Sequence, residues 1–386
     1  MSRLVFDADR GQRVPVRVWG RAISEDTIRQ FVRLASQPYV VDHVAAMADA
    51  HLSEGIAVGT VFATEHAVVP RALGGDLGCG MSAIRLSGVS GEVERRTLQS
   101  FVELLGRAVP AGEAIHRGRG VDVPGELLAG PLSTHALEHT REALAPRHLG
   151  TLGGGNHFLE LDRDPEGDLW LLVHSGSRGL GAAVAAHHAR AAGASTSDPF
   201  AALDVREEPG RAYLADVEWA LAFARENRRR LASRALDVLS SVLGAPVTPG
   251  ESLDVHHNFV AQEPWGGRAL LVHRKGAIAA PLGARALIPG SMGTASYVVE
   301  GLGEPASFGS CSHGAGRVLR RSEARERIST AALDRSMRHV VYPAHLARHL
   351  VEEAPAAYRD VREVLEDQED LVVRRLRLEP LAVLKG

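Results

Sequence analysis

The stretch LGGGNHFLEL, residues 152–161, runs from a glycine-rich turn directly into an apolar segment, with an asparagine and a histidine at the junction. Glycine allows the backbone to approach a bound group closely and readily takes up positive φ angles. Loops on a rigid scaffold are also where proteins usually carry their chemistry. The stretch therefore predicts a turn that presents polar side chains to a site.

Similar turns recur along the chain. Each places glycine or asparagine beside side chains that can ligate a metal, bind phosphate or act as nucleophiles. The other turns are MADAHLSEG (47–55), GGDLGCGM (74–81), VHSGSRGLG (173–181), HHN (256–258), VHRKG (272–276), PGSMGTAS (289–296) and FGSCSHGAGR (308–317). Turns of one kind at so many places predict one site assembled from several loops.

Composition excludes several classes of protein. The 386 residues are 45% hydrophobic and 24% charged, with a net charge of −3, which is typical of a soluble globular chain and not of a disordered one. A polyanion must therefore bind at a local basic cleft and not through overall charge. Only two of the 44 basic residues are lysines, Lys275 and Lys385. The bias towards arginine is explained by a GC-rich genome, but the positions of the two lysines are not.

The chain gives no signal for secretion or membrane insertion. Its two cysteines cannot form a disulfide framework or a four-cysteine zinc site. The first twenty residues lack the apolar centre of a signal peptide, and no apolar run approaches the roughly 20 residues of a membrane helix. We therefore expect a cytoplasmic protein without a membrane partner.

Apolar periodicity predicts both helices and strands. Helical spacing is clearest over residues 213–243, where residues 225–230 form a charged face and Gly244 ends the pattern. No linker divides the chain, so we expect one domain over residues 1–386, with 191–211 as the best candidate for a small excursion. Further helices are expected at 323–351 and 356–366, and buried strands at 68–70, 170–174, 269–273 and 371–378.

Four histidines stand apart because they lie in glycine- or asparagine-containing turns: His157, His174, His257 and His313. Six others fall in helical stretches, where a solvated or core role is the default: His135, His139, His187, His188, His345 and His349. Asp76 and Cys79, with His157, His174 and His257, form a mixed O, S and N ligand set that suits Zn or Mn. The alternative for Cys79 is a small buried hydrophobe.

Other residues are suited to phosphate. Arg178 and Arg317 each follow a histidine by four residues, and a guanidinium fork matches phosphate geometry. Ser291, Gly293, Thr294 and Ser296 could cradle a phosphate or nucleoside. The P-loop, the GxGxxG signature and the lysine-nucleophile pattern KxDG are absent. The residues alone are thus compatible with a two-metal phosphodiesterase or with a nucleotidyl transferase whose nucleophile is a histidine such as His313.

Taken together and in order, the motifs resemble the RtcB family of RNA-splicing ligases over essentially the whole chain. The stretches that carry the resemblance are residues 49–80, LGTLGGGNHFLE (149–160), 173–181, 256–258, 272–277, 288–297, 307–317, EAPAAYRDV (353–361) and the closing VLKG (383–386). The resemblance implies an α+β fold in one large domain, with mixed sheets and peripheral helices around a deep central cleft.

It also implies a GTP- and Mn²⁺-dependent RNA ligase. Such an enzyme joins an RNA 3′-phosphate, or a 2′,3′-cyclic phosphate opened to one, to a 5′-hydroxyl, in RNA repair or tRNA splicing, and some need an activating protein. In the family pattern two Mn²⁺ ions are held by Asp76, Cys79, His157, His174 and His257, with Cys79 bridging. His313 attacks the α-phosphate of GTP, guanylate passes to the RNA 3′-phosphate, and the 5′-hydroxyl then displaces GMP.

The resemblance assigns further residues to the nucleotide and the RNA. Asn156 would contact the nucleotide phosphate and Glu160 the guanine, Arg178 and Arg317 would bind phosphates, and Asp49 and His51 would lie near the active site. The remainder of the guanosine pocket would be Ser291, Ser296, Gly314, Ala315, Gly316, Tyr358 and Lys385.

Two departures from the family pattern point to a divergent subgroup. GGDLGCG stands where typical members carry Tyr–Asp–Ile–Asn–Cys–Gly, and Cys311 in SCSHGAGR is shifted by one position. Both leave the expected ligands and nucleophile in place. They leave open a guanylyltransferase that caps nucleic-acid 3′-phosphates without sealing, and a noncatalytic RNA-binding relative.

Overall fold

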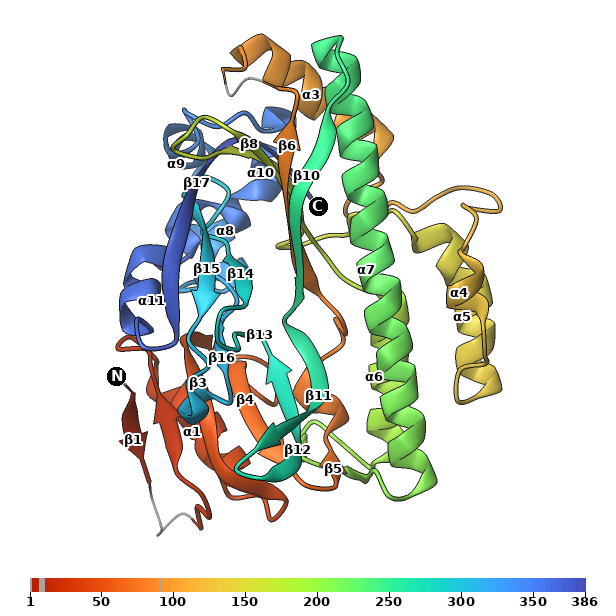
Figure 1. The fold of residues 1–386 in the computed structure, drawn as a ribbon, viewed down its shortest axis with the longest axis vertical. Helices are drawn as coiled ribbons and strands as arrows, with labels where there is room; N and C mark the ends of the chain where they lie inside the picture. The colour runs from red at the N-terminus through yellow and green to blue at the C-terminus, as the bar shows by residue number, and fades with distance from the viewer. Residues whose placement is uncertain (1, 7–10, 90–91) are drawn as a thin grey trace.

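Two large β-sheets form the centre of the fold in the computed structural model, which describes residues 2–6, 11–89 and 92–386 (Figure 1). The first sheet has six strands, with only β2 and β3 parallel among its pairs. Its strands, in spatial order, are β1 (Arg3–Val5), β2 (Val16–Val18), β3 (Val40–His51), β4 (Val58–Thr64), β12 (Arg268–Lys275) and β11 (Asn258–Trp265).

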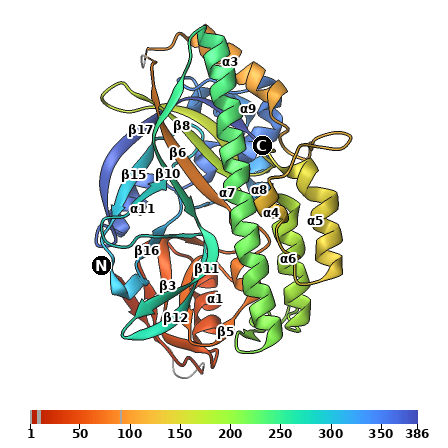
Figure 2. The same ribbon diagram turned by 45° about the vertical axis from the view of Figure 1, so that its right-hand side comes forward.

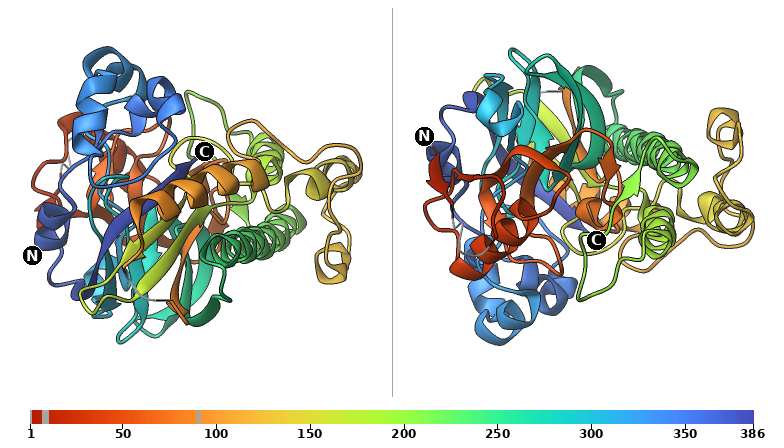
Figure 3. Two further views of the ribbon diagram at one scale, coloured as in Figure 1. Left: turned by 90° about the horizontal axis from the view of Figure 1, so that it is seen from above. Right: turned by 90° about the horizontal axis from the view of Figure 1, so that it is seen from below.

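The second sheet has seven strands and is antiparallel throughout. Its C-terminal strand is inserted between two strands from far earlier in the chain, so the C-terminus lies inside the fold (Figures 1 and 3). The order is β10 (Thr248–His256), β6 (Gly80–Ser87), β8 (Leu169–Ser175), β7 (Phe158–Arg163), β17 (Val372–Lys385), β15 (Ser296–Gly301) and β14 (Arg285–Ile288).

At one of its crossings, the chain passes directly from the seven-stranded sheet to the six-stranded sheet through a single residue. β10 belongs to the seven-stranded sheet and β11 to the six-stranded sheet, and His257 is the only residue between them. Two short pairs complete the β-structure, β13 (Ala277–Ala279) with β16 (Ser310–Ser312) and β5 (Ala67–Val68) with β9 (Leu203–Asp204). The largest apolar core lies between the two sheets, and Met47 and Val272 of one face Met81 and Leu172 of the other.

The long helix α7 (Glu208–Leu243) packs along the outside of both sheets (Figure 2). Its first half buries Tyr213 and Val217 in a cluster with the six-stranded sheet, and its second half buries Leu231 and Leu239 in a cluster with the seven-stranded sheet. Gly244 ends the helix in the left-handed conformation at φ 65°. The helix expected over residues 213–243 is therefore confirmed.

Other helices surround this core, and α4 and α5 project beyond α6 and α7 (Figure 3). The longer ones are α1 (Glu25–Ala35), α3 (Arg95–Ala108), α5 (His135–His148) and α6 (Arg178–Ala191). The shorter ones are α2 (Pro70–Leu73), α4 (Gly125–Leu128), α8 (Arg321–Arg327), α9 (Thr330–Ser336), α10 (Ala347–Leu350) and α11 (Val361–Asp367), with 3₁₀ turns at Pro305–Ser307, Ala344–Leu346, Val351–Glu353 and Pro355–Ala357. Among the described residues, none of these helices is long and apolar enough to cross a membrane.

Several expectations from the sequence were correct and several were wrong. Strands expected at 170–174, 269–273 and 371–378 lie in β8, β12 and β17. The strand expected at 68–70 is confirmed only at Val68, the last residue of β5, and is wrong at Pro70, which begins α2, where a missing N–H is harmless.

The helix expected over 323–351 is broken into α8, α9, a 3₁₀ turn and α10. Ser329 caps a new helix with its side chain, and Pro343 cannot continue one. The helix expected over 356–366 begins only at Val361, where the side chain of Asp360 caps it. In the segment 191–211, a short strand, β9, pairs with β5.

Candidate active site

Three of the expected metal ligands lie where neighbouring strands of the seven-stranded sheet begin or end. Cys79 directly precedes β6, His157 directly precedes β7, and His174 lies one residue from the end of β8. Because β8 runs antiparallel to both neighbours, these positions fall at the same end of the three strands. Met81 and Phe158 both pair with His174. The strand order, not the spacing in the sequence, brings these ligands together.

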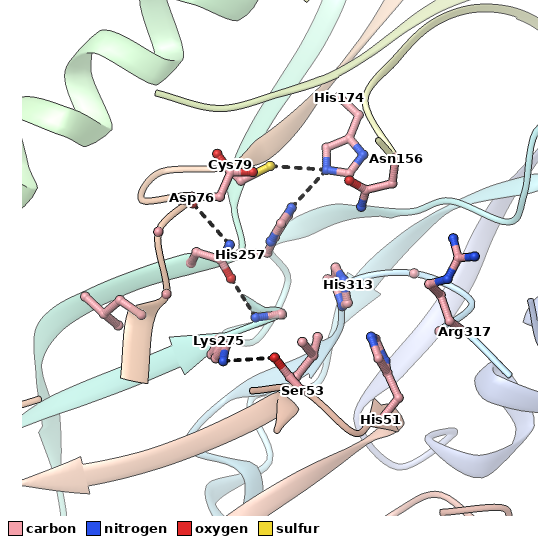
Figure 4. A pocket seen from close by; sticks show the side chains of 18 of the residues that line it. His51, Ser53, Asp76, Cys79, Asn156, His174, His257, Lys275, His313 and Arg317 are labelled. Atoms are coloured by element: carbon pink, nitrogen blue, oxygen red, sulfur yellow. Dashed lines mark hydrogen bonds between the residues drawn. The ribbon is translucent and has the colours of Figure 1, made fainter. Parts of the chain in front are cut away.

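The potential ligand atoms face one another at short distances. The Sγ atom of Cys79 lies 3.3 Å from Nε2 of His157 and 3.3 Å from Nε2 of His174. Nε2 of His174 lies 3.1 Å from Nε2 of His257 (Figure 4). Nε2 of His157 lies 3.2 Å from Oδ2 of Asp76. A thiol, a carboxylate and three imidazoles that converge in this way are suited to a borderline divalent cation such as Zn²⁺ or Mn²⁺.

The electrostatic environment favours ligation as well. Burial lowers the pKa of both His174 and His257 well below the usual value, so each ring is neutral and has a lone pair to offer. Burial raises the pKa of Cys79, and a bound cation would offset this by stabilising the thiolate. Nδ1 of His157 lies 3.0 Å from the carbonyl oxygen of Leu152, which directs Nε2 towards the other ligands.

Two side chains of α7 hold the loops that carry these ligands. Arg228 is fully buried, donates to the carbonyl oxygens of Gly78 and Ser175, and pairs with Asp254 at 2.6 Å. Asn227 donates to the carbonyl oxygen of Thr151 and to other groups of the same loops. The expected charged face at 225–230 is therefore wrong for these two residues. Helical periodicity cannot reveal that they satisfy carbonyl oxygens of distant loops.

His313 follows β16 directly and lies beside the ligand cluster. Its ring centroid is 4.8 Å from that of His257, and its Nδ1 is 2.7 Å from Oδ2 of Asp49 in β3. Asp49 is completely buried, and burial opposes ionisation, but the charge of His313 holds the pKa of Asp49 below its usual value. His51 lies nearby, with Nδ1 3.1 Å from the carbonyl oxygen of Asp49 (Figure 4). Oδ2 of Asp49 thus faces Nδ1 of His313, and Nε2 is the ring nitrogen that does not contact this carboxylate.

Gly276 leaves room for this histidine. Its φ is +63°, and a Cβ atom there would lie 2.2 Å from Cγ1 of Val58 and 3.1 Å from Cε1 of His313. A side chain would therefore be strained by the backbone and would also collide with its surroundings. The absence of a side chain at Gly276, in the VHRKG turn, therefore allows the ring of His313 to lie where it does.

These groups open into a pocket of about 640 Å³. One part of it is lined by Asn156, Phe158, Glu160, Ser291, Met292, Ser296, Tyr358 and Lys385. We call this part the nucleotide lobe, after the ligand that the resemblance predicts for most of these residues. Lys385 is buried at the end of β17, where its Nζ donates to the carbonyl oxygen of Asn156 at 3.2 Å and lies 5.3 Å from the centre of the Phe158 ring. Gly314, Ala315 and Gly316 line the pocket next to His313.

Glu353 links three of the expected residues. It lies 3.3 Å from Nζ of Lys385 and 3.1 Å from Nη1 of Arg317, and it accepts a hydrogen bond from the hydroxyl of Tyr358. Arg317 also donates to the Tyr358 hydroxyl at 2.9 Å. One buried carboxylate therefore fixes two cations and a phenol at one wall of the pocket.

Of the residues singled out from the sequence for metal, nucleotide or phosphate, four do not line the pocket: His157, Arg178, Gly293 and Thr294. His157 lies behind Asp76 and Cys79. Arg178 lies behind His157, with Nη1 3.0 Å from Nδ1 of that ring. Its φ of +59° and its closeness to Gly153, where a Cβ would lie 1.6 Å from Nη2, show how tightly this arginine is held.

Several residues that line or support the pocket have no role that could be predicted from the sequence. Lys275 is buried there and donates to the carbonyl oxygen of Ile56. The one signal for it in the sequence is that it is one of only two lysines in a chain that otherwise uses arginine. Glu353 opens the EAPAAYRDV stretch but has no distinctive pattern of its own. Arg71, Arg190 and Arg321 also line the pocket, and nothing in their spacing distinguishes them from the many surface arginines. Both cysteines are free and buried, and Cys311 lies in β16.

Comparison with known proteins agrees with this arrangement. The family model described as tRNA-splicing ligase RtcB matches residues 30–129 and 115–386. The RNA-splicing ligase RtcB of Escherichia coli K12 is 34% identical, over 97% of this chain and 98% of that protein. The protein of the same name from Mycobacterium tuberculosis is 33% identical, over 92% and 100%. The tRNA-splicing ligase RtcB of Thermococcus kodakarensis is 28% identical, over 98% and 96%.

Proposed function

The chain belongs to the RtcB family of RNA-splicing ligases, and we propose that it is a GTP- and Mn²⁺-dependent enzyme that joins RNA 3′-phosphate or 2′,3′-cyclic phosphate ends to 5′-hydroxyl ends. The observation that carries the proposal is the position of His313, whose ring centroid lies 4.8 Å from that of His257, beside a cluster of potential metal ligands. A nucleophilic imidazole next to a divalent-metal site is the arrangement that nucleotidyl transfer requires.

We assign the metal ions to Asp76, Cys79, His157, His174 and His257. The donor set fits, because neutral imidazoles, a carboxylate and a thiol converge at 3.1–3.3 Å, and His157 is oriented by a backbone carbonyl. Bound Mn²⁺ would supply positive charge that stabilises the phosphate oxygens during transfer. Such a site also selects for the neutral forms of His174 and His257, which burial already favours.

His313 is the proposed nucleophile. Asp49 lies 2.7 Å from Nδ1 and holds the proton on that nitrogen, so that the lone pair of Nε2 is directed towards the α-phosphate of GTP. The new P–N bond forms as the bond to pyrophosphate breaks. The buried carboxylate then balances the positive charge that develops on the ring. Guanylate passes to the RNA 3′-phosphate, and the incoming 5′-hydroxyl displaces GMP.

We place the guanosine in the nucleotide lobe, with Glu160 and Lys385 facing the base and with Asn156, Ser291, Ser296 and Tyr358 around it. Gly314, Ala315 and Gly316 leave backbone N–H groups near the phosphates. We further propose that Arg317, with Arg71, Arg190 and Lys275 around the pocket, binds RNA phosphates, and that Arg178 acts through His157. This pocket would then be the catalytic cleft of the enzyme. RNA affinity should fall steeply as salt rises.

The direct test is guanylylation of the protein. Incubation with α-³²P-labelled GTP and MnCl₂ should give a covalent adduct that is labile in acid and stable in alkali, as expected for a phosphoramidate. His313→Ala should abolish the adduct. His349→Ala is the matched control, because His349 is exposed and lies outside the pocket, and it should label like the wild type.

Addition of RNA with defined ends then separates the possible activities. A ligase transfers the label to a 3′-phosphate end and releases it as GMP when a 5′-hydroxyl partner is added. An enzyme that only caps would accumulate the guanylylated RNA in the presence of that partner. An Mn²⁺-loaded, folded protein that forms no adduct at all would contradict the proposal.

A further inference from the structure

A pair of acidic residues lies at the floor of the nucleotide lobe. Glu160 and Asp162 are two positions apart on β7, so both point to the same face of the seven-stranded sheet. That face is the interior of the fold, where Phe158 from the same strand joins the main apolar core. Glu160 lines the pocket, whereas Asp162 lies behind it and is 0% exposed.

Among the described residues, the carboxyl group of Asp162 has no hydrogen-bond donor, and its neighbour on the strand face is the carboxyl group of Glu160. The two residues are neighbours on one face of β7, both are buried, and each acts on the pKa of the other. Neither side-chain oxygen of Asp162 accepts a hydrogen bond from an N–H or O–H group of the described residues. Two neighbouring ionised carboxylates, shielded from water and without a donor, repel each other strongly. The pair must therefore hold at least one proton.

The neighbouring charges indicate where that proton resides. On β17, Lys385 acts on Glu160 and favours its ionised form, while Glu379 acts on Asp162 and disfavours its ionised form. On β8, the cross-strand partners Leu172 and Trp170 bring no charge, and the indole N–H of Trp170 is already used by Asp164 at 2.9 Å. When the pair holds one proton, that proton therefore resides on Asp162, and Glu160 is the ionised member.

We propose that Asp162 is a positioning residue for nucleotide recognition, which keeps its proton and donates it to Glu160, so that the free oxygen of Glu160 is aimed at a nucleobase edge with adjacent N–H donors. Guanine presents such an edge, and adenine presents an acceptor at the equivalent ring nitrogen. The inference rests on the proposed function, and it adds a residue to which the resemblance assigns no role.

The pair should make nucleotide binding depend on pH. Burial raises the pKa of Glu160 to about 8, although Lys385 opposes the shift, and burial next to Glu160 raises the pKa of Asp162 further. Below about pH 8 the free protein therefore carries a second proton, on Glu160. Guanine binding requires the carboxylate form of Glu160, so binding releases this proton, and affinity weakens as the pH falls.

The test compares GTP binding by the wild type, Asp162→Asn and Asp162→Leu from about pH 6 to pH 8. Asparagine keeps a donor to Glu160 but removes the second acid, so Glu160 ionises at lower pH. The ratio of the two dissociation constants cancels the titration of the GTP phosphates and of the metal ligands. Wild-type affinity should fall by up to about tenfold per pH unit relative to Asp162→Asn. Asp162→Leu, without a donor, should bind GTP about tenfold more weakly at pH 8, and Asp162→Asn should not.

Proton release on GTP binding gives a second readout. Calorimetry in buffers of different ionisation enthalpy should detect one proton released per GTP bound at pH 7 by the wild type and none by Asp162→Asn. Asp164→Asn, just beyond the end of β7 and outside the pair formed by Glu160 and Asp162, is the matched control and should behave like the wild type. Parallel pH profiles and equal proton release for the wild type and Asp162→Asn would overturn the inference while leaving the ligase intact.

The pair can also be observed without nucleotide. Infrared spectroscopy of the free protein at pH 7 should show a neutral carboxyl C=O band that is lost in Asp162→Asn. If GTP fails to bind to any of the proteins, the proposed function is wrong and so is the role of Asp162 in recognition. If GTP binds and the band is absent, only the inference about Asp162 is wrong.

Discussion

Replacement of Asp49 by asparagine should disable His313 without unfolding the protein. The side chain is completely buried, and Oδ2 lies 2.7 Å from Nδ1 of His313 and also accepts a hydrogen bond from the His313 backbone N–H at 3.2 Å. Asparagine has nearly the same shape, so packing is preserved. It can, however, donate a proton to Nδ1, which favours the tautomer with hydrogen on Nε2 and removes the nucleophilic lone pair.

The size of the effect follows from the charge that develops on the ring. Charge centres about 4 Å apart at an effective dielectric constant of about 20 attract by about 4 kcal/mol. Asparagine retains a dipole but loses this attraction, which corresponds to a rate reduction of up to about a thousandfold. The wrong tautomer acts in the same direction. We therefore expect guanylylation to slow by a factor of about a hundred to a thousand.

The assay is single-turnover formation of the GMP adduct at saturating GTP and Mn²⁺, so that nucleotide affinity does not enter. Ser312→Ala is the matched control, because Ser312 accepts a hydrogen bond from the backbone N–H of Asp49 and does not bear on the ring. It should change the rate by only a few-fold. A rate for Asp49→Asn within about fivefold of the wild type would refute the assigned role of Asp49.

Three other substitutions probe the metal ligands, the base pocket and the space around His313. Cys79→Ser should lower the Mn²⁺ retained after gel filtration, measured by atomic spectroscopy, and should reduce the rise in melting temperature that Mn²⁺ gives the wild type. Lys385→Gln should raise the KM for GTP about ten- to a hundredfold, because a charged hydrogen bond is worth about 1.5–3 kcal/mol, with a smaller effect on kcat. Gly276→Ala should destabilise the protein by more than about 1 kcal/mol through strain and overpacking against Val58. Gly283→Ala has a similar positive φ and no atom within 4 Å, so it isolates the strain alone and should unfold at lower denaturant than the wild type but higher than Gly276→Ala.

Local sequence patterns were sufficient for some elements and insufficient for others. The helix at 208–243 could be predicted because its apolar periodicity extends over many turns and Gly244 ends it. The break at Ile328–Ser329 could not, because a serine cap competes with continued helix only when tertiary contacts favour it. Pro343 is a local signal against a helix that continues to residue 351, because proline cannot sit in a helix interior.

In the candidate site, too, local patterns were sufficient for some features and insufficient for others. Each turn with a metal-capable side chain could be recognised singly, because glycine beside histidine or cysteine is a local feature. Their meeting depends on β8 lying between β6 and β7, which no spacing in the sequence reveals. Arg228 and Glu353 were missed for a related reason, since their partners are separated from them by long stretches of chain or by a 3₁₀ turn that only the fold defines.

The position of the cluster between the two large sheets ties the proposed metal site to the stability of the fold. Cys79, His157 and His174 come from the seven-stranded sheet, Asp49 beside His313 comes from the six-stranded sheet, and His257 is the crossing residue between them. A cation bound at this place therefore adds a link between elements that already meet through the apolar core and through hydrogen bonds such as that from the Gly78 N–H to the carbonyl oxygen of Asn258. Because metal binding to a folded site contributes directly to folding free energy, Mn²⁺ should stabilise the packing of one sheet on the other as well as the ligands themselves. Chelation should then increase amide hydrogen exchange at β10 and β11 on both sides of His257. Residues 231–243 of α7, which pack on the seven-stranded sheet beyond the two side chains that hold the ligand loops, should exchange as before.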